Sequence, residues 1–424
     1  MPERDVRVEM VGHATLRIHA GGRTLLTDPW LIEPICAGSM FHFPPLVHDL
    51  AEVAASTDAI HISHAHPDHF HRPTLAALPK RLPIYIARYR HKRFRDAVRA
   101  LGFRDVVEAP FGEATAIDGT PFAITPLEPP TAAHGYDSAV VVRTPEFDLF
   151  ANNDCVLHAD SYRWVRDRFS IDYAFLGYSS ASAYPICFEM PPAEKARLLR
   201  AAAERRFGDF LEAAQLLAPR LTVPFANGMR FLAARSLAKN AVFSSAVEAV
   251  SRVRRMGLAG EVMRPGDRID SDHRVRRHGG TDDAEDEPAE IAAHAREMPG
   301  PSADAEPHRA RRDDVVERFR AHVVALWRRE RERFPSVSRY VIAYQILGAP
   351  RPLFSFDFSR PDDAIFAWGS PPRYDMRYTY PARALEMALD GAMDFEDVHF
   401  ADDVSIHQVV YAAEYWAMLS GEPR

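Results

Sequence analysis

The chain has 424 residues, of which 47% are hydrophobic and 26% are charged, and its formal net charge is −7. This composition is typical of globular proteins and excludes the disordered and fibrous classes, while the length predicts two domains or one domain with a large appendage. The acidic balance gives no electrostatic reason to expect nucleic acid as a partner, because binding to phosphate backbones relies on clustered Lys and Arg.

Two features of the composition bear on location. The sequence has no run of about eighteen apolar residues, and its first residues, MPERDVRVEM, carry charge where a signal peptide would be apolar. We therefore expect no association with a membrane. The three cysteines, Cys36, Cys155 and Cys187, are too few and too irregularly spaced for a disulfide framework, which favours a reducing, cytoplasmic location.

The first part of the chain predicts a meander of strands and then a mixture of strands and helices. VRVEMV, ATLRIHA and RTLLTDPW have the pattern of strands. From Asp58 onward the pattern predicts the strands DAIHIS and PIYIA, the helix RHKRFRDAVRALGF, the strands DVVEA, PFAITPL, SAVVVR and DLFAN, the helix SYRWVRDRF and the strand DYAFLG. Apolar residues at helical spacing predict a long helix from Pro191 to Arg220. This order favours two sheets between two layers of helices.

Residues 277–310 are rich in Gly, Asp, Glu, Pro and Ala, a composition that buries too little apolar surface to fold. We expect a flexible linker here, between a catalytic domain of residues 1–276 and a C-terminal α+β domain of residues 311–424. In this last part DDVVERFRAHVVALWRRERERF predicts an amphipathic helix, VIAYQILG, LFSFDF and AIFAWG predict strands, and ARALEMALDG predicts a short helix. The alternating aromatic residues of these strands indicate a core, and the unit is expected to cap an active site or to form a homodimer surface.

The segment Ser63-His64-Ala65-His66-Pro67-Asp68-His69 follows the apolar strand DAIHIS. Two histidines two residues apart in extended backbone point to the same side, and Pro67 fixes a turn that lets Asp68 and His69 diverge to a neighbouring point. Such a set suits one or two divalent metal ions about 3.5 to 4 Å apart, with zinc, iron or manganese favoured over calcium. The alternative is a histidine-rich surface loop that binds no metal.

HAHPDH, together with GHATLRI and LLTDPW near the N-terminus, resembles the signature segments of the metallo-β-lactamase superfamily. The resemblance implies an αββα sandwich and two metal ions. His64 and His66 would hold the first metal together with a third histidine, for which His134 is the candidate; Asp68 and His69 would hold the second, and Asp154 would bridge the two. Asp68 and Asp154 are thereby the expected catalytic residues. Asp28 would orient a ligand, and His13 is either a similar partner or a satisfied core histidine.

One departure from the superfamily pattern concerns its last histidine, which lies in a segment resembling Pro-x-His-x-Gly. The corresponding segment, Val223 to Gly228, has no histidine. Three alternatives follow: the second metal has fewer protein ligands, His158 or Glu189 replaces the missing group, or only one metal binds tightly.

YSSASAYPICFEMPPAEKARLL, PRLTVPFANG, RPGDRID and ARALEMALDGAMDFEDVHF resemble, in the same order, the metallo-β-lactamase portion of CMP-N-acetylneuraminate hydroxylase. That family consists of iron-dependent monooxygenases that act on a nucleotide sugar and carry a Rieske iron-sulfur domain. A Rieske centre needs a Cys-x-His pair and a Cys-x-x-His pair, and this sequence has only Cys155 and His158 in the second spacing. We therefore expect any electrons to come from a separate ferredoxin or reductase.

The sequence is compatible with two enzymatic functions. The resemblance favours a dinuclear iron oxygenase or hydroxylase acting on a small polar metabolite or a nucleotide-linked substrate. The alternative is a zinc-dependent hydrolase of a phosphodiester, ester or lactone, in which the metal lowers the pKa of a bound water and Asp68 orients it. A third class, a non-catalytic binding protein, is disfavoured by the complete HAHPDH segment.

Overall fold

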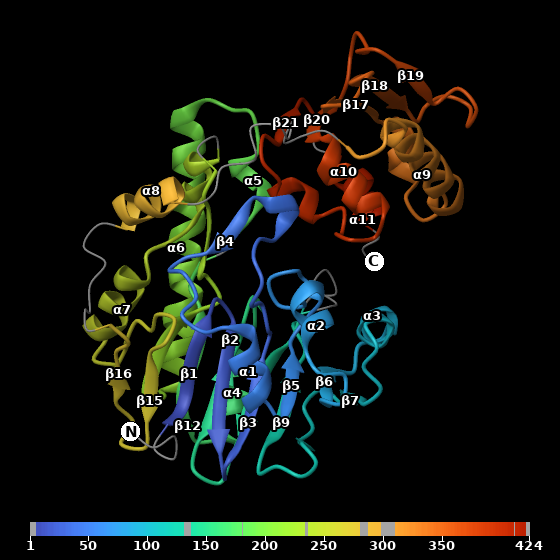
Figure 1. Ribbon diagram of the computed structural model, residues 1–424. Helices are drawn as coiled ribbons and strands as arrows, with labels where there is room; N and C mark the ends of the chain where they lie inside the picture. Colours follow the sequence, from blue (N-terminus) through green and yellow to red (C-terminus); the bar gives the residue numbers. More distant parts are fainter. Residues whose placement is uncertain are drawn as a thin grey trace.

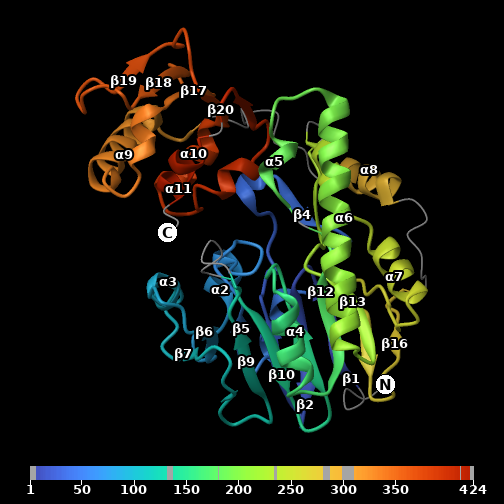
Figure 2. The same cartoon turned by 180° about the vertical axis from the view of Figure 1, so that it is seen from behind.

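The computed structural model describes residues 6–130, 137–179, 181–233, 236–279, 287–297, 310–410 and 412–420. Two large sheets face each other through the first part of the chain (Figures 1 and 2). In order across the first sheet the strands are β16 (Val275–Arg276), β15 (Arg268–Asp270), β1 (Val6–Gly12), β2 (Thr15–Ala20), β3 (Arg23–Thr27), β5 (Ala59–Ile62), β6 (Ile84–Ala87) and β7 (Val106–Ala109). The predicted meander is β1 to β3, and β3, β5, β6 and β7 run parallel to one another.

The second sheet has six strands. In order they are β13 (Leu221–Phe225), β12 (Ile171–Gly177), β11 (Asp148–Ala151), β10 (Ala139–Arg143), β9 (Ala123–Leu127) and β8 (Thr115–Ala116). The pairs β11–β12 and β12–β13 are parallel. Since the carboxyl ends of parallel strands meet at one edge of a sheet, the loops that follow β11 and β13 lie at a common edge.

Helices cover the outer face of each sheet, while apolar side chains from both inner faces form one shared core that includes Ile18, Val140 and Phe175. Over the first sheet lie α1 (Leu50–Ser56), α2 (Arg72–Ala77) and α3 (Arg93–Ala100); over the second lie α4 (Ala159–Arg166), α6 (Pro192–Leu217) and α7 (Ala246–Arg255). The expected αββα sandwich is therefore confirmed. The long helix α6 ends at Leu217, three residues earlier than predicted, and the next residue, Ala218, takes a left-handed backbone conformation.

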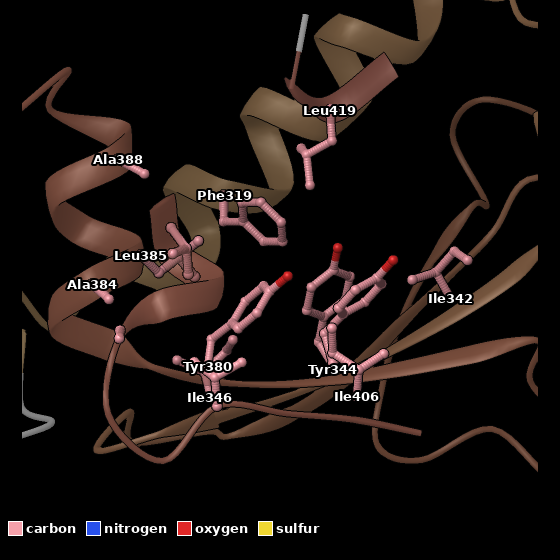
Figure 3. Packing of buried hydrophobic residues seen from close by; sticks show 14 of the residues in the cluster. Phe319, Ile342, Tyr344, Ile346, Tyr380, Ala384, Leu385, Ala388, Ile406 and Leu419 are labelled. Carbon is pink, nitrogen blue, oxygen red and sulfur yellow. The ribbon is translucent and has the colours of Figure 1, made fainter. Parts of the chain in front are cut away.

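The C-terminal part forms a separate five-stranded sheet. Across it the strands are β19 (Phe366–Trp368), β18 (Leu353–Asp357), β17 (Val341–Leu347), β20 (Met376–Pro381) and β21 (Ser405–Gln408), and the helices are α9 (Val315–Glu330), α10 (Ala382–Leu389) and α11 (Ala413–Ser420). Figure 3 shows Tyr344 and Tyr380 extending from this sheet toward Phe319 and Leu385 on the helices. Of the alternating aromatic residues, Phe354, Phe356 and Phe358 are core, as expected, whereas Phe366 is half-buried and Trp368 is exposed.

The C-terminal sheet is joined to the sandwich by one continuous apolar core. Trp30 and Phe231 of the first part belong to the same buried cluster as Phe319 and Tyr344. The short elements β4 (Met40–His42), β14 (Met229–Phe231) and α5 (Ala183–Ile186) lie where the two parts meet. The backbone of Ile406 in β21 also exchanges hydrogen bonds with the segment after α5, at 2.8 Å each. The two expected domains thus pack as one body.

Part of the expected linker is ordered. Residues 287–297 form α8 (Glu287–Glu297), and Ile291 on this helix is buried in a small cluster with Phe43 and Leu232. Residues 280–286 and 298–309 of the linker lie outside the described residues. The composition of the segment gave no sign of an apolar side chain that packs against the sandwich, and such tertiary packing stabilises a short helix that is marginal by itself.

None of the described helices combines the length and the apolar character needed to cross a lipid bilayer.

Candidate metal centre

The segment from Ser63 to His69 leaves β5 and turns sharply before α2. The backbone N–H of His69 donates to the carbonyl oxygen of His66 at 3.0 Å, which closes the turn. The carbonyl oxygen of Ser63 accepts hydrogen bonds from the hydroxyls of Tyr89 and Ser138, so the start of the segment is tied to both sheets. The turn is buried and rigidly placed, unlike a histidine-rich surface loop.

Backbone strain is concentrated around this turn. Four residues that are not glycine adopt left-handed backbone conformations just after strands that end here: His13 (φ 44°), Asp28 (φ 39°), Asn153 (φ 51°) and Ala226 (φ 55°). Each such residue costs about 1 to 3 kcal/mol, and conformations of this kind persist where the surroundings fix them, most often at functional sites. The strain thus marks the same region as the histidines.

Asp28 orients the histidines, as expected. Its Oδ2 lies 2.8 Å from Nδ1 of His69, and Ser63 Oγ donates to the same oxygen at 2.7 Å. Ser63 Oγ in turn lies 2.9 Å from Nδ1 of His64. Because the Nδ1 atoms of His64 and His69 are engaged in this way, their Nε2 atoms are the ones that lie near Asp154 at the centre, which is the arrangement that metal-binding histidines show.

The first group of possible ligands consists of His64, His66 and Asp137, whose donor atoms lie within 4.8 Å of one another. His64 Nε2 is 2.8 Å from His66 Nδ1 and 3.8 Å from Asp137 Oδ1. The structure therefore brings the two predicted histidines together and adds Asp137, which sequence reasoning missed. His134, the predicted third ligand, lies outside the described residues.

The other two groups are His64, His69 and Asp154, and His13, Asp68 and His69. Asp154 Oδ2 lies 3.8 Å from His64 Nε2 and 3.5 Å from His69 Nε2, so it stands between the groups as a bridging carboxylate would. Asp68 Oδ2 is 3.6 Å from His69 Nε2. All the predicted site residues that the structure describes thus converge.

The electrostatics of the cluster fit a bound cation. Burial lowers the pKa of His69, but the carboxylates of Asp68 and Asp154 outweigh it and hold this pKa well above its usual value. Desolvation raises the pKa of the half-buried Asp154, but His69 outweighs it and holds this pKa well below the usual range. The Nε2 atom of His69 is buried and makes no hydrogen bond. Imidazole nitrogens and carboxylate oxygens at these separations are the donor set of a transition metal, so the residues fit one or two such ions.

Metal binding to the metal-free protein at pH 7.5 should release one to two protons per chain, roughly, because metals bind only neutral imidazole. Burial lowers the pKa of His66, but Asp137 and Glu396 outweigh it and raise this pKa to about 9, and the pKa of His69 is raised too. His66 therefore starts out protonated at pH 7.5, and the pKa of His69 is shifted in the same direction. Titration calorimetry in buffers of different ionisation enthalpy measures the release; the number should fall as the pH passes 9, and heats that do not depend on the buffer would contradict the expectation.

A cavity of about 360 Å³ opens over the cluster. Its floor includes His66, Asp68 and Asp154, and its opposite wall comes from the C-terminal part of the chain. The lining residues from that part include Tyr378, Glu396, Asp397, His399, Phe400 and Trp416. The C-terminal unit therefore forms part of the site, in agreement with the expectation that it caps an active site.

Sequence reasoning missed Glu396, Asp397 and His399. They lie in the segment DFEDVHF, which stood out only through a family resemblance, and nothing in its residue pattern indicates a site. Asp397 is buried, and this burial together with the acidic groups Asp394 and Glu396 holds its pKa well above the usual range although His66 acts in the opposite direction. Apart from the histidines, the basic residue among those that line the cavity is Arg206 on α6.

Neither residue suggested as a replacement for the missing histidine reaches the cluster. His158 is exposed at the start of α4. Glu189 is exposed and pairs with Arg377, its Oε2 3.2 Å from the guanidinium. Both suggestions were therefore wrong. Neither residue could have been excluded from the sequence, since only the fold shows which strand ends meet.

Comparison with known proteins identifies a family for the part of the chain that includes the segment from His64 to His69. Residues 7–126 match the family described as the Beta-lactamase superfamily domain. Over 87 residues the chain is 39% identical to the cytidine monophosphate-N-acetylneuraminic acid hydroxylase of Asterias rubens, covering 19% of this chain and 13% of that protein. Over 120 residues it is 32% identical to the hydroxylase of the same name from Mus musculus, covering 27% of this chain and 20% of that protein. The matches span a small part of these relatives' length.

Solved structures of similar fold include both hydrolases and a hydroxylase. A metallo hydrolase from Ignicoccus hospitalis aligns with a TM-score of 0.43 and 18% identity, over 64% of this chain and 99% of that chain. The diiron β-hydroxylase CmlA from Streptomyces venezuelae aligns with a TM-score of 0.45 and 19% identity, over 66% of this chain and 55% of that chain. Residues 7–126, which include the HAHPDH segment, therefore match the β-lactamase superfamily domain, and the two-sheet sandwich around them has the metallo-β-lactamase fold.

Proposed function

We propose that the protein is a metal-dependent oxygenase that hydroxylates a small polar metabolite or a nucleotide-linked substrate at a dinuclear iron centre. The observation that carries the proposal is the composition of the three ligand groups, each of which has two histidines and one aspartate. Two histidines and one carboxylate with open positions are typical of non-haem iron oxygenases. The hydroxylase relatives, at 39% and 32% identity over their matched segments, support the same reaction class.

Bound iron would supply the redox chemistry that inserts one oxygen atom of dioxygen into a C–H bond, with the balance R–H + O₂ + 2 e⁻ + 2 H⁺ → R–OH + H₂O. The two electrons would come from a separate ferredoxin or reductase, since the sequence contains no Cys-x-His pair for a Rieske centre. The protons would come through groups on the cavity wall.

The chain's own residues have separate tasks in this proposal. Asp68 and Asp154 hold donor oxygens at the centre, and Asp28 fixes the ring of His69 through its Nδ1 atom. The wall formed by Tyr378 and Trp416 shields the cavity from water, which strengthens polar interactions inside it. Substrate enters between this wall and the metal cluster.

A zinc-dependent hydrolase of a phosphodiester, ester or lactone is the second candidate. Catalytic zinc is also held by two histidines and one carboxylate with an open position for water. The position of Asp154 between two ligand groups favours this candidate as much as the first, because a two-metal site that activates water also needs a bridging carboxylate.

The two candidates differ in metal and in oxygen use. Protein purified without oxygen should contain iron, and after loading with Fe(II) it should consume dioxygen when a chemical reductant and a candidate substrate are added. The metal is measured by mass spectrometry and the oxygen with an electrode. Full occupancy by zinc, with turnover of phosphodiesters or lactones and no oxygen uptake, would establish the hydrolase instead.

A further inference from the structure

The ligand group of Asp68 and His69 has its third member on a different strand end, at His13. This residue follows β1, and its side chain is only 4% exposed. Its backbone lies against the segment after β13: a Cβ atom on Gly228 would come within 2.8 Å of the His13 nitrogen. Only glycine therefore fits at position 228, and the close approach fixes the left-handed conformation of His13.

The ring of His13 faces the cluster without a hydrogen bond of ordinary geometry. Neither of its nitrogens has a hydrogen-bond partner, although Nε2 lies 3.1 Å from Asp68 Oδ2. Its ring centroid is 5.3 Å from that of His69 and 5.7 Å from that of Trp30, so the ring is wedged between them. A buried polar group left without a hydrogen-bond partner is destabilising, and a metal ion bound to it would remove that cost.

The distances agree with ligands of one metal ion. Donor atoms about 2.1 Å from a tetrahedral metal lie about 3.4 Å from each other. Asp68 Oδ2 is 3.1 Å from His13 Nε2 and 3.6 Å from His69 Nε2. On the other side of this group Ala226 lines the same cavity as Asp68 and offers only a methyl group.

We propose that His13 is a ligand of the second metal, together with Asp68 and His69, and that it takes the role of the histidine missing from the Val223 to Gly228 segment. The proposal rests on the two-metal centre of the proposed function but is independent of the reaction. With Nε2 on the metal, Nδ1 carries the proton. His13 lines, with Tyr178 and Asn227, a small cavity of about 90 Å³ that has room for a water molecule as a hydrogen-bond partner.

The experiment measures metal stoichiometry and affinity directly. The metal-free protein is titrated with Co(II) in the absence of oxygen. Visible absorption monitors the binding, and competition with a chelator gives the affinity. The wild type should bind two ions per chain. In His13→Ala and His13→Asn the first ion should bind as in the wild type, while the second should bind more than 100-fold more weakly, beyond the roughly 10- to 100-fold loss that follows removal of an outer-shell partner. Asn accepts the left-handed backbone of this position, so the second variant guards against misfolding.

His42→Ala is the matched control. His42 is also fully buried and packs on Trp30, with ring centroids 3.7 Å apart, but among the described residues it belongs to no ligand group. This variant should keep both ions. His13→Ala combined with Ala226→His should regain the second ion, because histidine tolerates the left-handed conformation of position 226.

The assignment would be overturned by a His13→Ala protein that binds two ions as tightly as the wild type, or by a wild type that binds one ion only. A loss of at most 100-fold would reduce His13 to an orienting partner of Asp68 and would overturn it too. If the expected pattern of metal binding is found but no oxygen is consumed, the assignment of His13 stands and the proposed oxygenase function fails.

Discussion

Replacing His64 with alanine should remove the first metal ion, weaken binding of the second, and reduce kcat/KM by about 10³-fold or more, the scale of loss when a group at the reacting centre is deleted. The reason is its place in the cluster. His64 is the one histidine that belongs both to the group with His66 and Asp137 and to the group with His69 and Asp154. Metal content by mass spectrometry and turnover of whichever substrate is identified are the two measurements.

Two further variants provide comparisons for the loss of metal in His64→Ala. His61→Gln changes a histidine on the same strand that is equally buried but bonds through Nδ1 to the carbonyl oxygen of Tyr85, outside the ligand groups of the described residues. It should keep both ions. The effect of Asp28→Asn should lie between those of His61→Gln and His64→Ala, with a loss of about 10- to 100-fold in metal affinity, because this substitution disturbs only the orientation of His69. Full metal content in His64→Ala would mean that the centre lies elsewhere in the chain.

The sequence predicted those parts of the site that are close together along the chain. His64, His66, Asp68 and His69 share one turn, so their spacing alone indicated a metal site. Asp154 was predicted because the family resemblance implies a bridging aspartate at the end of a strand, and Asp154 follows such a strand. Asp137 and His13 were not assigned as ligands, since a single Asp or His in a loop carries no local signal. Their role follows from which strand ends meet, and that is a property of the two sheets.

The same argument explains the C-terminal part. Periodicity predicted its helices and strands well, because alternating aromatic residues and an amphipathic helix are local patterns. The contribution of Glu396, Asp397 and His399 to the cavity depends on packing between segments more than three hundred residues apart, such as Trp30 against the core of the C-terminal sheet. Residues 277–310 likewise contained a docked helix that composition could not indicate.

The continuous core leads to a prediction on stability. Phe319→Ala should lower the free energy of unfolding by about 3 to 5 kcal/mol, the range for removing a buried phenyl ring. Phe319 has no exposed surface, and its ring centroid lies 5.1 Å from that of Tyr344 and 6.1 Å from that of Phe356. Phe366→Ala, on the partly exposed strand β19, is the matched control and should cost less because water already reaches its ring.

Urea unfolding, monitored by tryptophan fluorescence and by circular dichroism, tests whether the substitution destabilises the whole chain or the C-terminal unit alone. Because Trp30 of the sandwich and Phe319 lie in one buried cluster, both probes should report a single transition in the wild type and the same displaced midpoint in Phe319→Ala. Two transitions, of which only the earlier one moves, would instead show that the C-terminal unit unfolds by itself. In that case its cavity residues would leave the metal cluster while the sandwich stays folded, and the wall over the site would be a movable lid.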